Sequence, residues 1–115
     1  MIYDSTNVKK INIGNYKQIY GNVDIAIKVT SNHLTPVYVQ GDILLISKSP
    51  VRDGDIGVFI NKETGRAYLR KYCNGNPVSL VPVNDFGFAF EVNPLNESDV
   101  SKWYKFGKVI TKIRA

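Results

Sequence analysis

Alternation of apolar and polar residues constrains the fold of this chain more than any other feature. Within residues 24–30 the apolar side chains of Ile25, Ile27 and Val29 fall on one side, and Lys28 and Thr30 fall on the other. Successive side chains of a β-strand point to opposite faces, so this period of two predicts a strand with one buried face. Helical periodicity is scarce, and we therefore expect a mostly β protein.

Further strands are predicted wherever a short apolar or alternating run is bounded by turn-forming residues: 42–47, 56–60, 66–72, 78–83, 86–92 and 106–113. Residues 62–65 and 74–77 are rich in turn formers and are expected to close hairpins. One helical turn is predicted at residues 96–103, capped by Asn96 or Ser98. Strands that recur about every ten residues predict a β-sandwich or barrel of short, mainly antiparallel strands.

The 115 residues suffice for a single domain with its own core. Residues 1–20 are polar and carry several turn formers, which predicts an N-terminal arm or linker, and residues 21–115 are expected to form the domain. No apolar run approaches the roughly 20 residues that span a bilayer, and the first residues lack the apolar region of a signal peptide. We therefore expect a cytoplasmic protein with no membrane role.

Cofactors and metals are not expected. Cys73 is the single cysteine and His33 the single histidine, so neither an internal disulfide nor a zinc site is predicted. The net charge of +5 permits contact with nucleic acid, because clustered cations release phosphate counterions. The lysines and arginines are spread along the chain, however, and a solvated surface explains their spacing equally well.

Several short segments follow one another in the order found in a known family. Their sequences are a strand leading into Leu34-Thr35-Pro36, then Gly41-Asp42 before an apolar run, Asp53-Gly54-Asp55-Ile56-Gly57-Val58, Leu69-Arg70-Lys71, Leu80-Val81-Pro82-Val83-Asn84 and Gly107-Lys108-Val109. In this order they resemble the C-terminal domains of LexA, UmuD and phage repressors, the S24 peptidases, whose fold is shared with signal peptidases. The resemblance implies a LexA-like β-barrel or sandwich.

The resemblance also implies a self-cleavage site in which a lysine accepts the proton of a serine nucleophile. In register with Pro36, the serine position is occupied by His33, and the lysine position falls on Arg70. Arginine cannot serve as that base, because its guanidinium stays protonated at biological pH. We therefore expect a degenerate member that is not an enzyme.

Two shifted arrangements stay open. Ser31 and Lys71 would take the catalytic roles if both segments slipped, although a slip of one residue turns Lys71 to the opposite face of its strand. Ser31 activated by His33 is the second arrangement, for which the sequence identifies no acid to orient the imidazole. Otherwise His33 is a turn residue and Arg70 a surface or ion-paired strand residue.

Without catalysis, the resemblance implies a non-cleaving oligomerisation and regulatory domain of a phage-type transcriptional repressor. We expect a homodimer that contacts DNA only through a helix-turn-helix domain upstream. Interface candidates are the apolar residues near the end, with core packing as the alternative for each: Trp103, Tyr104, Phe106, Val109 and Ile113, together with Phe86, Phe88 and Phe90. A self-cleaving peptidase and a free-standing UmuD-like or anti-repressor protein are the other functions left open.

Overall fold

The computed structural model describes residues 8–11, 22–84 and 87–113, and in these the chain forms eight β-strands and one short helix. The elements are, in order, β1 (Val8–Ile11), β2 (Ile25–Val29), β3 (Ile43–Ser47), β4 (Ile56–Asn61), β5 (Ala67–Cys73), β6 (Val78–Pro82), β7 (Phe90–Val92), α2 (Glu97–Lys102) and β8 (Trp103–Ile113). The predicted mostly β fold is confirmed. No helix in this part of the chain is long and apolar enough to cross a membrane.

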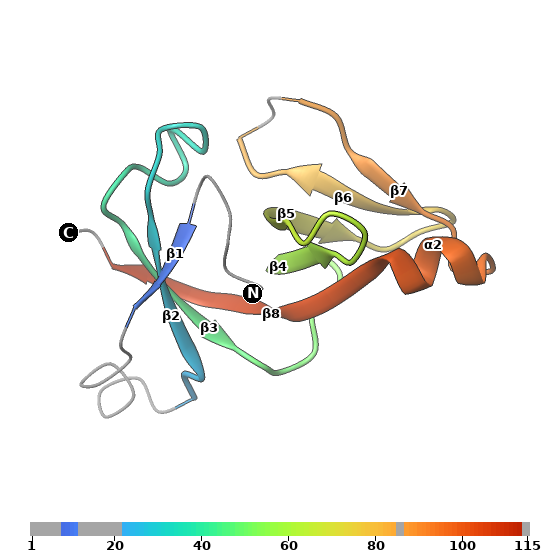
Figure 1. Ribbon diagram of the computed structural model, residues 1–115, viewed down its shortest axis with the longest axis horizontal. Helices are drawn as coiled ribbons and strands as arrows, with labels where there is room; N and C mark the ends of the chain where they lie inside the picture. Colours follow the sequence, from blue (N-terminus) through green and yellow to red (C-terminus); the bar gives the residue numbers. More distant parts are fainter. Residues whose placement is uncertain (1–7, 12–21, 85–86, 114–115) are drawn as a thin grey trace.

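The eight described strands form one antiparallel sheet in the order β1-β2-β3-β8-β4-β5-β6-β7. The eleven-residue strand β8 lies between β3 and β4 and pairs with both. Figure 1 shows β8 running along the molecule, with β1 to β3 towards one end and β4 to β7 with α2 towards the other. The last strand therefore joins two groups of strands that are separate in the sequence.

Three groups of buried side chains stabilise this sheet. The main core combines β2 to β5, Phe106 of β8 and two residues of the segment after β2, Leu34 and Tyr38. A second group, here called the β4–β7 cluster, contains Val51, Phe59, Val78 and Leu80, with Tyr72, Phe90, Val92 and Trp103 packed against it. A third, the small cluster, contains Val23, Ala26 and Leu45, with Ile43, Ile110 and Ile113 against it.

Strand β2 confirms the alternation from which its prediction came. Ile25, Ile27 and Val29 are buried in the main core, whereas Lys28 is exposed. Ala26 points to the opposite face and packs in the small cluster. This strand is consequently covered on both faces over part of its length, and only Lys28 interrupts the buried pattern.

The short helix α2 lies within the predicted segment. Asn96 is its N-cap, and the side-chain oxygen accepts hydrogen bonds from the backbone N–H groups of Ser98 (2.9 Å) and Asp99 (3.3 Å). At Trp103 the backbone turns to an extended conformation and continues directly into β8. The closing strand consequently begins at Trp103 rather than at residue 106, because no turn separates it from the helix.

Two other predicted segments differ from the structure. The strand expected at residues 86–92 is formed only over Phe90–Val92, and Phe86 lies outside the described residues. Val8–Ile11, inside the segment expected to be an arm, forms β1 and pairs with β2 from Val8 opposite Val29 to Ile11 opposite Ala26. This pairing satisfies backbone groups that β2 would otherwise leave open at a sheet edge. The rest of the predicted arm lies outside the described residues, and a domain boundary at residue 20 stays a prediction.

Tyr38 makes the stability of this fold sensitive to alkaline pH. Burial raises the pKa of its phenol above the ordinary value of 10.0, and the nearby Asp42 raises it further. The unfolded chain therefore releases this proton first, so the stabilisation is complete below pH 10.0 and is lost as the pH rises through the higher pKa of the folded protein. We expect Tyr38→Phe to lose less thermal stability than the parent protein between about pH 9 and 12. Melting curves check this, with Tyr104→Phe at an exposed position as the matched control; an equal loss in Tyr38→Phe and the parent contradicts it.

Candidate functional site

The segment between β2 and β3 carries Ser31 and His33, and it is anchored at several points. Leu34 and Tyr38 are buried in the main core. The buried carboxylate of Asp42 accepts a hydrogen bond from the backbone N–H of Val39 at 2.9 Å. These contacts attach the segment to the main core.

Asn84 ties this segment to the end of β6. Its side-chain amide nitrogen donates to the backbone oxygens of His33 (2.8 Å) and Thr35 (3.0 Å). Pro82, two residues before Asn84, is the register partner of Arg70 on β5. The Asn84 contacts bring the His33 segment beside the end of β6 on the side of the main core, whereas strand alternation puts the Arg70 side chain on the opposite face of β5, against Phe90.

Arg70 is half-buried and is engaged by its own chain. Its Nη1 donates to the backbone oxygen of Phe88 at 2.6 Å and to that of Leu80 at 3.4 Å. The guanidinium carbon lies 4.5 Å from the centre of the Phe90 ring and 5.6 Å from that of Tyr68, within the range of cation–π attraction. Burial lowers the pKa of Arg70 from its usual value, and Tyr68 opposes this. Arg70 thus fastens the chain before β7 onto β5 and β6.

Lys71 and Ser31, the residues of the shifted arrangement, have different surroundings. Strand alternation puts Lys71 on the same face as Ala67 and Leu69, which pack in the main core, and opposite to Arg70. The Lys71 side chain is nevertheless exposed to solvent. Ser31 is half-buried, and its Oγ accepts a hydrogen bond from the backbone N–H of His33 at 3.3 Å. The His33 residue is exposed to solvent.

Replacing Arg70 tests its fastening role. We expect Arg70→Ala to lower the free energy of unfolding by about 1–3 kcal/mol, because two backbone oxygens lose a charged donor. Arg70→Lys keeps the charge but not the planar donor geometry, so it should recover only part of the loss. Denaturant unfolding measures the stability, and amide hydrogen exchange should accelerate in Phe90–Val92. Arg66→Ala, at an exposed position before β5, is the control, and an equal effect there would contradict the assignment.

The predicted interface residues separate into different environments. Phe106 is 4% exposed and belongs to the core, which was the alternative expected for each candidate. Trp103 is half-buried, with its ring 4.9 Å from that of Phe90 and 5.7 Å from that of Tyr68. Val109 packs against the main core and Ile113 against the small cluster, so these two do not form one patch. Tyr104 and Phe88 are exposed, by 46% and 89%.

Sequence reasoning missed two features of this region. The sequence identified Asn84 only as the last residue of a family motif. Nothing local in the sequence reveals that its side-chain amide reaches the His33 segment. An apolar pocket on the β4–β7 cluster was also not predicted, because its walls come from five strands and a helix. Within the described residues no group of three or more His, Cys, Asp or Glu side chains is placed to hold a metal ion.

Comparison with known proteins agrees with the order of motifs and with the sheet. A search of curated proteins found no match to the chain. The family model described as Peptidase S24-like matches residues 2–110, which is nearly the whole chain. Because this match covers far more than half of the residues, the chain belongs to the Peptidase S24-like family.

Proposed function

We propose that this chain is a non-cleaving, self-associating regulatory domain of a phage-type transcriptional repressor. The observation that carries the proposal is the set of contacts made by Arg70. In the resemblance to LexA, UmuD and phage repressors, this residue occupies the position of the catalytic lysine. Its guanidinium binds the backbone oxygens of Phe88 and Leu80 and stacks on Phe90, which is a structural role. A group that stays protonated and is held in this way does not accept a proton from a nucleophile.

The test of the non-cleaving part is the integrity of the chain under conditions that favour a lysine base. We expect the intact mass to be unchanged after long incubation from neutral to alkaline pH. Parallel incubation of Ser31→Ala and Lys71→Ala identifies the source of any fragment. Cleavage of the parent protein that either substitution abolishes would establish a shifted dyad and refute the proposal.

Self-association is assigned to the outer side of the small cluster. Ile43, Ile110 and Ile113 are half-buried there, on neighbouring parts of β3 and β8. Around Ile110 and Ile113 the backbone of β8 pairs with β3, whereas its pairing with β4 covers residues 103–108. Partly covered aliphatic side chains gain by further burial, which favours a contact between two copies.

Sedimentation velocity tests this assignment. We expect the parent domain to form a dimer and Ile113→Asp to shift it to the monomer, because a carboxylate would be buried without a partner. Tyr104→Asp, an equally acidic change at an exposed position near the other end of β8, should leave the dimer intact. A parent protein that is monomeric at all concentrations, or a dimer lost only in Tyr104→Asp, would contradict the assignment.

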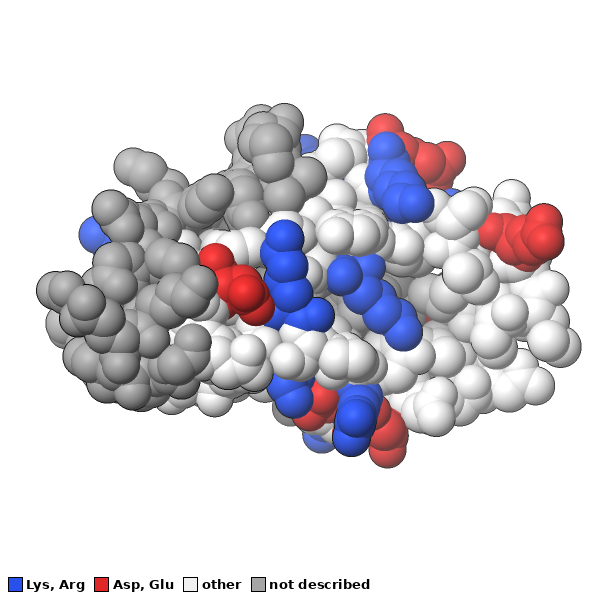
Figure 2. All heavy atoms as spheres, turned by 90° about the horizontal axis from the view of Figure 1, so that it is seen from below, with Lys and Arg blue, Asp and Glu red and all other residues white. Residues whose placement is uncertain are grey.

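The charge distribution is in keeping with DNA recognition by another domain. On the face shown in Figure 2, lysine and arginine side chains are interspersed with aspartate and glutamate. Nucleic-acid interfaces use clustered cations that follow the phosphate backbone. The repressor function therefore requires a separate DNA-binding domain, and we expect the isolated chain to bind duplex DNA without sequence preference and only at low salt. Sequence-selective binding in a mobility-shift assay at physiological salt would contradict this.

A further inference from the structure

A pocket of about 520 Å³ lies on the β4–β7 cluster, at the end of the molecule that carries α2. Its floor is formed by Phe59, Val78 and Leu80, all buried. Tyr72 and Trp103 form walls, and Val100 of α2, 49% exposed, stands at the rim. The volume falls in the range of small-molecule sites in proteins, about 300–1,000 Å³.

The lining is almost entirely apolar. Besides the residues above, it includes Val92, Pro94 and Tyr104, and Lys105 supplies the cationic group. On the face shown in Figure 2, the surface towards the α2 end is mostly uncharged. A largely apolar cavity with a few polar groups at one side binds ligands that have an apolar body and one polar end.

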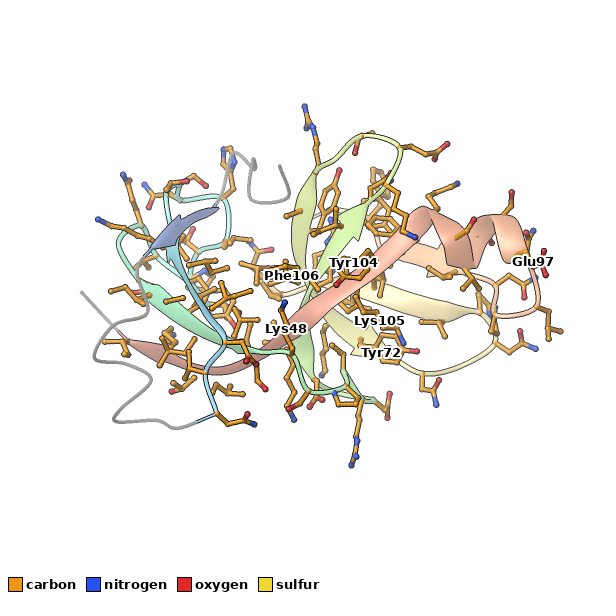
Figure 3. All side chains as sticks on the ribbon, turned by 60° about the horizontal axis from the view of Figure 1, so that its bottom comes forward. Lys48, Tyr72, Glu97, Tyr104, Lys105 and Phe106 are labelled. Atoms are coloured by element: carbon orange, nitrogen blue, oxygen red, sulfur yellow. The ribbon has the colours of Figure 1, made fainter. Side chains whose placement is uncertain are left out.

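Lys105 gives the pocket its polarity. Its Nζ lies 4.5 Å from the centre of the Tyr72 ring and donates to the Tyr72 hydroxyl at 3.3 Å. Figure 3 shows Lys105 and Tyr72 side by side, with Glu97 at the far end of α2. Among the described residues, one ion pair is formed, between Lys102 and Glu63. Lys105 therefore has no carboxylate partner in this part of the chain. The Tyr72 contacts hold the ammonium near the pocket and leave its charge uncompensated.

We propose that this pocket binds a small amphipathic carboxylate, with its apolar chain or ring between Tyr72 and Trp103 and its carboxylate on Lys105 and the Tyr72 hydroxyl. The apolar lining supplies the affinity, because burial of the ligand's hydrocarbon removes it from water. The ammonium and the hydroxyl select an anionic end over a neutral one. This inference does not depend on the regulatory role proposed above, since it involves neither Arg70 nor the small cluster.

Trp103 provides the readout, because it is the only tryptophan of the chain and lines the pocket. We use octanoate as the probe and octan-1-ol as its uncharged counterpart. Both are expected to change Trp103 fluorescence in a saturable way, with a Kd for octanoate in about the millimolar range for a ligand of this size. Octanoate should bind about threefold to fivefold more tightly than octan-1-ol.

Two variants locate the binding, with a third as control. Lys105→Gln should remove the preference for octanoate and leave the affinity for octan-1-ol unchanged, because it removes the ammonium and leaves the apolar lining in place. Val100→Phe narrows the mouth of the pocket at an exposed position and should weaken both probes. Lys108→Gln removes a lysine of the same strand that does not line the pocket, and both affinities should stay as in the parent.

Three outcomes of the ligand titrations would overturn the proposal. They are an absence of saturable binding, an octanoate preference that survives in Lys105→Gln, and affinities that are unaffected by Val100→Phe. A change of Trp103 emission with protein concentration alone would also overturn it, since it would mean that a second copy fills the pocket. None of these results bears on chain integrity or on Ile113→Asp, so a failure here is distinguishable from a failure of the proposed function.

Discussion

Gly107→Ala is expected to lower the free energy of unfolding by about 2–3 kcal/mol, because β8 crosses β3 too closely there for a side chain. A Cβ at this position would lie 2.6 Å from the backbone oxygen of Ser47 and 2.7 Å from Cγ2 of Ile46. Ser47 is fully buried and paired in β3, so its oxygen cannot move aside without disturbing the sheet. Denaturant unfolding measures the loss.

The control for Gly107 is Lys108→Ala at the next position of the same strand. Lys108 is half-buried, and its replacement creates no contact of this kind. We expect its stability to change by about 0.5 kcal/mol or less. A Gly107→Ala protein as stable as Lys108→Ala would show that the two strands can separate enough to admit a methyl group.

Phe59→Ala is expected to have the largest effect of all, a loss of about 3–5 kcal/mol in the free energy of unfolding. Phe59 is 1% exposed in the β4–β7 cluster, and its ring stacks on Tyr72 with the centres 6.1 Å apart. Its removal costs the transfer free energy of the ring and leaves a void beneath the pocket. Because many small domains are stable by only about 5–15 kcal/mol, partial unfolding at physiological temperature is the expected consequence.

Phe88→Ala is the matched control, since the same side chain is removed from a position that is 89% exposed. We expect a change of about 0.5 kcal/mol or less there. Thermal and denaturant unfolding of both variants give the comparison. Equal losses would mean that Phe59 is not a central packing residue, and that the apolar pocket does not rest on it.

The strands could be predicted from the sequence wherever local pattern and burial agree. Alternation located β2, and apolar runs between turn formers located β3 and β4, because both signals arise within a few residues. β1 was missed, since Val8–Ile11 carries two lysines and forms a strand by pairing with β2. Such pairing depends on a neighbour that is distant in sequence, which a local pattern does not contain.

The candidate site was predictable only as a set of positions. The order of the motifs shared with the family identified His33 and Arg70. It did not identify the hydrogen-bond partners of Arg70, which are the backbone oxygens of Leu80 and Phe88, 10 and 18 residues away. Which carbonyl a side chain reaches depends on the packing of three strands. The environment of the interface candidates could not be predicted for a similar reason. The face of the sheet on which Val109 or Ile113 lies depends on a register shift between Leu45 and Ile46 of β3.

The central place of β8 also sets a condition on how the chain folds during synthesis. Until Trp103–Ile113 has left the ribosome, β3 and β4 each have an unpaired edge, and Phe106 is missing from the core. The nascent chain can therefore complete its hairpins but not its sheet, and these edges are open to wrong pairing with other chains. Correct folding is expected to be a late event, finished after nearly the whole domain has been translated.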